Sequence, residues 1–262
     1  MNIDDINADR YLPPAVEGKP VTPESAAAGA ATELPLATLR SLQMSGDIAI
    51  GKLIVSKLKL NNIKMNLRAK DGDIRIDPAT ADLYEGKYQG KVALDVTGKV
   101  PAITVNSQLQ AVNLDPLLRD YLQKPDSPLA GIADLSFEPV TGRGSDADQI
   151  KKSLTGAGKL KVTEGLLRGV DIPKALEQVE IMIESKTPGK VQAEGNTAFQ
   201  QLTATLDIKN GAVFNQDLLM LADGFNVTGD GMLANLHDQT IKYDMKVAVT
   251  ETRTTRGRSE EH

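Results

Sequence analysis

The most suggestive chemical motif in the chain is a glycine-rich run that ends in lysine, Gly156-Ala157-Gly158-Lys159. A phosphate-binding loop needs a longer glycine spacing, a serine or threonine after the lysine, and a helix that opens at the loop, because backbone amides and the helix terminus together hold the phosphates. Here Leu160 follows the lysine, and Leu160 and Val162 alternate with polar residues as in a strand. The run therefore predicts a glycine turn from a helix to a strand.

Carboxylates and histidines indicate no catalytic or metal site. Pairs such as Asp71 and Asp73 stand near turns and on polar faces, whereas general acid–base catalysis needs a concave site that perturbs its groups. Asp223 and Asp230 offer too few oxygens, too widely spaced, for a calcium loop. The chain has two histidines, one of them His237 in a polar segment, and no cysteine. We therefore expect no enzyme activity, no metal and no cofactor.

Composition narrows the class of protein further. The 262 residues are enough for a sizeable core, but aromatic residues make up only 3%, so the core must pack with aliphatic side chains. The net charge of −5 argues against a nucleic-acid partner.

The absence of cysteine fits either the cytoplasm or a bacterial periplasm. Apolar runs are far shorter than the ~20 residues that span a bilayer. The residues after Met1 form no signal peptide, so we expect any targeting segment outside this chain.

Apolar and polar residues alternate with a period of two through most of the chain, which is typical of strands with one buried and one solvated face. The clearest example runs from residue 241 to residue 250. Two pairs, Asp71-Gly72 and Asn210-Gly211, separate such runs and predict tight hairpin turns, since glycine accepts a positive φ. We therefore expect a mainly β protein built on an antiparallel sheet.

Three short helices are predicted at 116–122, 147–154 and 171–185, each opened by a capping residue or proline. The third carries an apolar stripe, and its polar face is acidic, which favours packing against the sheet over binding to an anionic membrane. Residues 1–33 are rich in proline and alanine and predict a linker or disordered lead-in. Residues 251–262 predict a flexible tail, so the folded domain is expected at 34–250.

A weak internal repeat supports a single extended sheet. The hairpin glycines Gly72 and Gly211 are each followed, 18 residues later, by another glycine, Gly90 and Gly229, with similar apolar runs between. A third, partial copy is expected to start at Glu164-Gly165. Repeated hairpins that add edge to edge extend one sheet rather than build separate domains.

Several segments resemble the AsmA family. Residues 154–172 fit its core pattern of Leu-Thr-Gly-x-Gly, a strand, acidic-Gly-x-Leu-x-Gly-Ile/Val-Asp and then a helix. Further matches, in the family's order, lie at 2–14, 112–120, 197–211 and 227–231. The resemblance covers roughly residues 1–14 and 36–249 and identifies the chain as similar to the family's carboxy-terminal domain. Full-length members also carry an amino-terminal membrane anchor and a long preceding β region.

The resemblance implies a periplasmic domain of a protein anchored in the inner membrane of a Gram-negative bacterium and involved in outer-membrane biogenesis. AsmA-like proteins are similar in architecture to bridge-like lipid transfer proteins, so it also implies a curled antiparallel sheet, open as a groove or half-barrel. Expected partners are phospholipid acyl chains and the remainder of the full-length protein. The residues expected to line the groove are Ile63, Met65, Leu67, Val92, Leu94, Val96, Leu206, Ile208, Tyr243, Met245 and Val247.

Three functions compete at this point. The leading hypothesis is a groove that binds or conducts lipid. The alternative is a non-catalytic periplasmic scaffold whose apolar face is filled by its own helices or a second sheet, and which influences outer-membrane protein assembly. The third is an enzyme of envelope polysaccharide or lipid, which requires polar groups clustered in a pocket.

Overall fold

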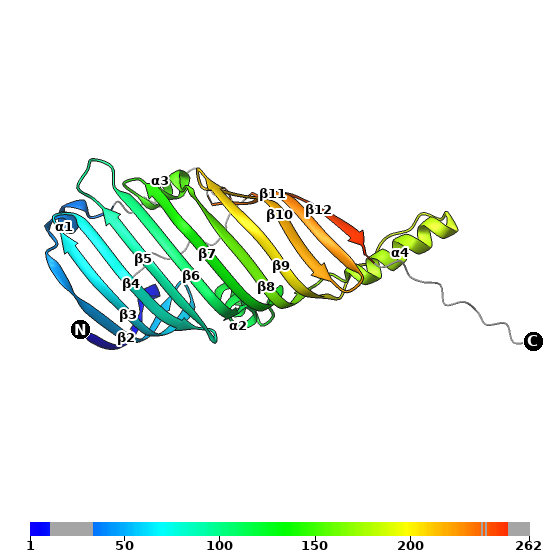
Figure 1. The fold of residues 1–262 in the computed structure, drawn as a ribbon, viewed down its shortest axis with the longest axis horizontal. Coiled ribbons are helices and arrows are strands. Elements are labelled where there is room, and N and C mark those ends of the chain that lie inside the picture. The colour runs from blue at the N-terminus through cyan, green and yellow to red at the C-terminus, as the bar shows by residue number, and fades with distance from the viewer. Residues whose placement is uncertain (11–33, 237, 239, 251–262) are drawn as a thin grey trace, which may run out of the picture.

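The computed structural model describes residues 1–10, 34–236, 238 and 240–250. Its twelve strands form one sheet whose spatial order is the chain order (Figure 1). The strands are β1 (Asn2–Asn7), β2 (Met44–Val55), β3 (Leu58–Lys70), β4 (Asp73–Leu83), β5 (Gly86–Asp95), β6 (Ala102–Asn113), β7 (Leu129–Arg143), β8 (Gly156–Arg168), β9 (Asn196–Lys209), β10 (Ala212–Ala222), β11 (Phe225–Asn235) and β12 (Lys242–Val249).

Neighbouring strands are antiparallel, apart from the parallel pair β1 and β2. The two hairpins expected from sequence are confirmed. Asp71 and Gly72 have φ angles of 51° and 86°, and Asn210 and Gly211 have 50° and 75°. Two successive positive φ angles suit the right-handed twist of the flanking strands.

The helices lie at the ends of the strands rather than in a continuous second layer (Figure 1). They are η1 (Ala8–Arg10), α1 (Leu36–Ser41), α2 (Leu114–Leu122), α3 (Ala147–Ser153) and α4 (Ile172–Ser185). We call the end of the sheet that carries α1, α3 and the 71–72 turn the upper rim. The end that carries α2, α4 and the 84–85 and 223–224 turns is the lower rim.

The three expected helices are confirmed, and their caps explain where they begin. Asp146 accepts a hydrogen bond from the Gln149 amide at the start of α3, and Asp171 accepts one from the Lys174 amide at the start of α4. The cap of α2 is Asn113, which lies two residues before the expected Asp115. Helix α1 was not expected from sequence, since its six residues carry no side-chain cap.

The expected third copy of the repeat is wrong. Glu164-Gly165 lies inside β8 and forms no hairpin; there, two residues of β8 face the single residue Gly131 of β7, and Glu164 has a φ of 52°. Asn62 in β3 and Ala111 in β6 have the same left-handed conformation inside strands, next to register shifts. Such β-bulges bend a strand and increase its twist. They therefore contribute to the curl of the sheet.

The lead-in differs from expectation at its start. Asn2–Asn7 form β1, paired in parallel with β2, instead of a linker. The physical reason is that Ile3 and Ile6 pack on the cluster around Ile50, Ile63 and Ala81. The Asp9 carboxylate also accepts hydrogen bonds from the amides of the 56–57 turn, at 2.5 and 2.8 Å. The rest of the predicted linker, 11–33, and the predicted tail, 251–262, lie outside the described residues.

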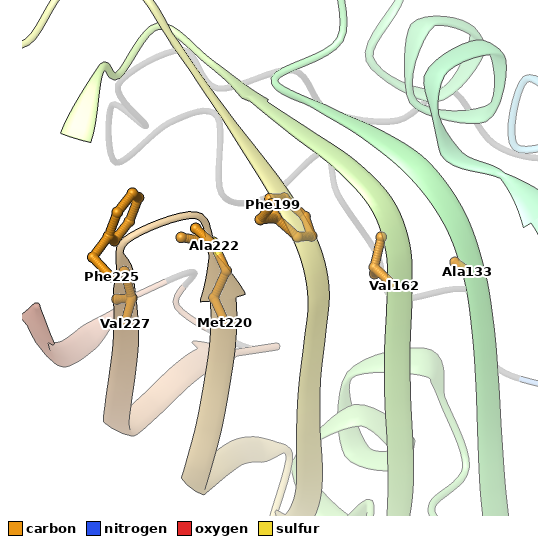
Figure 2. Packing of buried hydrophobic residues seen from close by; sticks show 7 residues of the cluster. All are labelled: Ala133, Val162, Phe199, Met220, Ala222, Phe225 and Val227. Atoms are coloured by element: carbon orange, nitrogen blue, oxygen red, sulfur yellow. The ribbon is translucent and has the colours of Figure 1, made fainter. Parts of the chain in front are cut away.

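Two apolar clusters form the core. The smaller is the β1–β4 cluster just described. The larger lies on consecutive strands from β7 to β11, as Figure 2 shows, and packs against Leu114 of α2 and Ile172 and Leu176 of α4. Its buried members are Ala133, Val162, Phe199, Met220, Ala222, Phe225 and Val227. Both clusters lie on the same face of the sheet.

Candidate functional site: an apolar trough

The strand register places the apolar side chains on a single face of the sheet. Directly opposed residues of neighbouring strands point to the same face. Leu67 lies opposite Ile76, which lies opposite Val92. At the other end, Val227 lies opposite Val247. Through such pairs the aliphatic face continues from β2 to β12, and all ten expected groove residues that lie within strands are on it.

This apolar face lies on the inner side of a bend. Helix α2 follows β6 yet contacts both β7 and β3, which are four positions apart in the sheet. A flat sheet would separate those strands by about 19 Å, so a nine-residue helix, about 13 Å long, reaches both more closely when the sheet bends around it. The sheet therefore curls toward the side on which Leu114 of α2 packs. We call the resulting surface, the apolar face from β2 to β12, the apolar trough.

The expected groove residues differ widely in exposure. Ile63 and Ile208 are buried, at 5% and 6% exposed, whereas Met245 on β12 is 69% exposed. Val247 is also exposed. Their remaining companions within strands are half-buried: Met65, Leu67, Val92, Leu94, Leu206 and Tyr243. The trough is thus filled at its core clusters and bare at its β12 end.

Val96 lies outside the trough. Strand β5 ends at Asp95, and Val96 sits in the turn at the upper rim, where its side chain is fully buried. Its amide donates to the Gly72 carbonyl at 2.8 Å, and its carbonyl accepts from the Arg40 guanidinium of α1 at 2.7 Å. The alternation of apolar and polar residues continues through Val96 and Thr97, although β5 ends at Asp95. The sequence pattern therefore does not mark where the chain leaves the sheet.

The opposite face of the sheet is polar. Short-range charge pairs cover it, such as Lys91 with Asp77 at 3.1 Å and Arg75 with Asp73 at 3.0 Å. A hollow of about 320 Å³ on this side is lined by Gln108, Asp134, Lys159 and Asp217 among others. Charges of both signs meet there, and Leu109, Leu135 and Leu160 also contribute to the lining.

A carboxylate cluster ties α2 to the lower rim. Asp115 accepts hydrogen bonds from Ser127 at 2.6 Å and from Arg168 of β8 at 2.7 Å, and Arg119 lies at 2.9 Å. These hydrogen bonds, from Ser127 first and then from Arg168, hold the pKa of Asp115 below its usual value. The cluster joins α2 to β8 and fixes the rim of the trough beside the larger core cluster.

A second contact holds α2 to the β3–β5 side. The Tyr84 hydroxyl donates to Asp120 at 2.7 Å and accepts from the Lys59 amide at 3.1 Å. The Lys59 ammonium pairs with Asp120 at 3.0 Å. Burial of the phenol is the main cause that raises the pKa of Tyr84 to about 12. We call these three residues the α2 clasp, because they connect α2 to strands far from it in the sheet.

A pocket that the sequence did not indicate lies at the lower rim, between α4 and the ends of β11 and β12. Its volume is about 640 Å³. Apolar residues from the helix and the sheet line it together with acidic ones: Leu176, Val179, Ile183, Phe225, Val249, Glu177, Glu180, Glu184 and Asp223. The stripe of α4 was expected to pack on the sheet. Ile172 and Leu176 do so, whereas Ile183 is 71% exposed.

The motifs that the sequence analysis rejected as functional sites are placed as follows. The glycine turn predicted at Gly156-Ala157-Gly158-Lys159 is wrong: the run forms the start of β8, and Leu154 and Thr155 make the connection from α3. Its backbone amides belong to a strand and open no helix. Asp223 lies in the turn between β10 and β11 and Asp230 on β11. Within residues 1–10 and 34–250, as far as they are described, no group of three or more His, Asp or Glu residues lies close enough to hold a metal ion. His237 and His262 lie outside the described residues.

Fold and surface together define a class: a single open, curled β-sheet with one continuous aliphatic face and helices along its rims. Comparison with known protein families then shows to which family the chain belongs. The family described as AsmA family matches residues 15–218, which is more than half of the sequence. The chain belongs to the AsmA family.

Protein AsmA of Escherichia coli (strain K12) is 25% identical to the chain over 196 residues. That match covers 72% of this chain and 30% of the relative, so the chain spans less than a third of that protein's length. No solved structure matches. Among the described helices, none has the length and apolar character needed to cross a membrane.

Proposed function

We propose that the apolar trough binds the acyl chains of phospholipids and lets them move along the sheet between the inner and outer membranes, in support of outer-membrane biogenesis. The observation that carries the proposal is the exposure of aliphatic side chains at the β12 end of a face that is continuous across the strands. Each buried methylene contributes about 0.8 kcal/mol. An acyl chain that covers Met245, Val247 and their neighbours therefore gains several kcal/mol.

The aliphatic character of the trough supports the same proposal. The chain has no tryptophan and few aromatic residues. Four of the rings lie across glycines: Tyr88 over Gly90, Phe137 over Gly158, Phe199 over Gly165 and Tyr243 over Gly229. Because these rings lie against the backbone of the sheet, they leave room on the apolar face for flexible acyl chains. Such a surface favours acyl chains in general.

Photocrosslinking tests this function with a matched pair of positions. Met245 and Lys246 are adjacent, exposed and on opposite faces of β12. A photoreactive residue at Met245, and in parallel at Leu94 or Leu206, is expected to capture phospholipid from a Gram-negative host at least about fourfold more than one at Lys246, since shielding a single methylene already gives such a ratio. The readout is the mass of the lipid adduct. Equal capture on both faces, or no lipid on either, would overturn the proposal.

A scaffold is the second candidate. The larger core cluster supports it, because α2 and α4 fill the trough over β7 to β11 and Val162 has no exposed surface. In that case the trough serves to build a rigid sheet, and its apolar side chains contact one another. The crosslinking pair separates the two functions, since a scaffold yields no lipid adduct at Met245.

The place of action is part of the proposal. An AsmA-family chain with this trough fits a periplasmic domain of a protein anchored in the inner membrane. Its partners are then the remainder of the full-length protein and phospholipid. We propose no enzymatic activity, and no nucleic-acid partner, in keeping with the net negative charge.

A further inference from the structure

Strand β12, the last strand of the sheet, has one edge that pairs with no other strand of the described residues. The Thr250 amide donates to the Gly224 carbonyl, so the backbone groups of the even-numbered residues of this antiparallel ladder face β11. The backbone groups of the odd-numbered residues face the open edge: Tyr243, Met245, Val247 and Val249. No proline, glycine or positive φ angle interrupts Lys242–Val249. The edge is therefore able to accept a further strand.

The side chains along this edge are apolar and exposed. They include Met245, Val247 and Val249, together with Ile241, which directly precedes the strand. The alternation along β12 places all of them on the side of the apolar trough. A partner at this edge must therefore offer both extended backbone and apolar side chains.

The polar face of β12 carries a carboxylate that lies beside another. Asp244 lies opposite Asp230 of β11, and like charges in that position destabilise a pair of strands. Neither carboxylate makes an ion pair with another described residue. Lys242 and Lys246 lie on the same face of the strand as Asp244, but each is two residues away, which is about 7 Å along the strand. A cation directly opposite Asp244 on the open edge would offset the repulsion.

We propose that β12 pairs with β12 of a second copy of this chain, in an antiparallel arrangement with a two-fold axis at Met245. Such a pairing closes on itself, so it gives a dimer rather than a filament. Asp244 then lies opposite the partner's Lys246, and Lys246 lies opposite the partner's Asp244. The two registers shifted by two residues place Lys246 opposite Lys246 or Asp244 opposite Asp244, so like-charge repulsion disfavours them.

The same register joins the two troughs. On the trough side, Ile241 lies opposite the partner's Val249, and Tyr243 lies opposite the partner's Val247. Directly opposed residues share a face, so the apolar trough of one copy continues into that of the other. This inference concerns the edge of the sheet and holds whether or not the trough carries lipid.

Contact between two such edges is small, and α4 adds to it. The helix extends past β12 at the Val249 end (Figure 1), beside the pocket between α4 and the ends of β11 and β12, which we call the α4 pocket. The exposed side chains Ile181 and Ile183 of α4 can contact the second copy there. Small interfaces are weak, so we expect the dimer to form at about 100 µM and to dissociate near about 1 µM.

Charge reversal tests the partner and the register together. Asp244→Lys leaves lysine at both central positions of the polar face, and Lys246→Asp leaves aspartate at both. Each variant alone is expected to dimerise at least about fivefold more weakly than the wild type, because like charges then oppose each other twice. An equimolar mixture of the two should regain the wild-type affinity as a mixed dimer. The double variant Asp244→Lys/Lys246→Asp restores both pairs within one sequence, so it is the control and should match the wild type.

Sedimentation velocity from about 1 to about 500 µM measures these dissociation constants. Asp244→Lys lowers the net negative charge of the chain, so repulsion between whole molecules would strengthen its dimer rather than weaken it. A wild-type chain that stays monomeric over this range overturns the proposal. A dimer that both variants leave unchanged also overturns it and would place the contact on another surface.

Disulfide formation between copies locates the axis, because the chain has no native cysteine. Met245 and Lys246 are adjacent and both exposed. Met245→Cys faces its own copy across the axis, with about 5.5 Å between the Cα atoms, a distance that a disulfide accepts, whereas the two copies of Lys246→Cys are diagonal and about 8 Å apart. We expect Met245→Cys to form its interchain disulfide at least about threefold faster in a glutathione buffer.

Equal rates for the two cysteine variants, or a faster Lys246→Cys, overturn the proposal. Hydrogen exchange at about 1 µM, where the dimer is dissociated, distinguishes one further occupant of the edge. If the amides of β12 are then protected as fully as those of β8, another segment of the same chain covers the edge, and the proposal is overturned in that case too.

Discussion

At the level of single residues, four glycines of the sheet lie directly against aromatic rings. The Phe199 ring on β9 lies directly against Gly165 of β8, so close that a Cβ at Gly165 would overlap it. Gly165 has no positive φ, so its lack of a side chain matters for space rather than for backbone conformation. The glycine is needed there because Phe199, 4% exposed, fills the larger core cluster.

Gly165→Ala is therefore expected to destabilise the fold by about 1–3 kcal/mol, the usual result of overpacking a filled core. Gly46→Ala on β2 is the matched control, since a Cβ there meets nothing within 4 Å. It should change stability by less than about 0.5 kcal/mol. Urea unfolding of the two variants and the wild type measures both values. Equal stabilities for the two variants would contradict the role given to Gly165.

At this scale the sequence predicts which way a residue faces better than how deeply it is buried. Period-two alternation correctly places both Ile63 and Met245 on the apolar face. It does not show that Ile63 packs in a cluster with Ile3 and Ile6 of β1, whereas Met245 lies on the last strand and is 69% exposed. Burial depends on the layers that pack on a strand, and these come from distant parts of the chain.

Among the elements, α2 has the most consequential contacts. The α2 clasp joins its Asp120 to Tyr84 and Lys59 on the other side of the bend. The pKa of Tyr84 in the folded protein, about 12, is above the value of about 10 for an unfolded chain. A group with a raised pKa contributes stability that is complete below the unfolded value and is lost as pH rises toward the folded value.

Tyr84→Phe is accordingly expected to cost about 1 kcal/mol at neutral pH, because it removes the hydrogen bonds that the hydroxyl makes with Asp120 and with the Lys59 amide. The difference from the wild type should stay constant up to about pH 10 and shrink above it. Urea unfolding from about pH 7 to 11 measures this. Tyr121→Phe, at a position on the same helix that is 55% exposed, is the control and should change stability by less than about 0.5 kcal/mol. A pH-independent difference would show that Tyr84 acts through packing alone.

The elements differ in how far sequence predicts them. The hairpins at Asp71-Gly72 and Asn210-Gly211 and the caps at Asp146 and Asp171 have specific local chemistry, and all four were recognised. The bulges were missed because Asn62, Ala111 and Glu164 adopt positive φ without a glycine to mark it. Strand β1 was missed because two isoleucines among acidic residues become a strand only when β2 offers its edge.

For the molecule as a whole, the open sheet predicts a gradient of local stability. Central strands such as β8 pair on both sides and carry buried residues, whereas β12 pairs with β11 alone, and most of its side chains are exposed. We expect amides of Lys242–Val249 to exchange hydrogen for deuterium before those of Gly156–Arg168, because edge strands with few buried contacts open at lower free energy. Exchange measured by mass spectrometry on peptides from the two strands checks this. Equal protection would indicate that β12 is covered.

The single-sheet architecture was predictable from sequence because the hairpin signals and the alternation agree over most of the chain. The α4 pocket was not, since Phe225 and Val249 are distant in sequence from α4 and meet it only once the sheet is built. Sequence patterns describe one element at a time, and a pocket between elements depends on how they are assembled.

The two ends of the trough are unequal: packed isoleucines lie at one, and bare aliphatic side chains lie at the other. A passive surface performs no work, so this inequality cannot drive a flow of molecules in one direction. The inequality can only determine at which end of the trough a bound molecule stays longest. Any net traffic along such a sheet must follow a difference in chemical potential maintained elsewhere, and the crowded end would then limit the rate of passage.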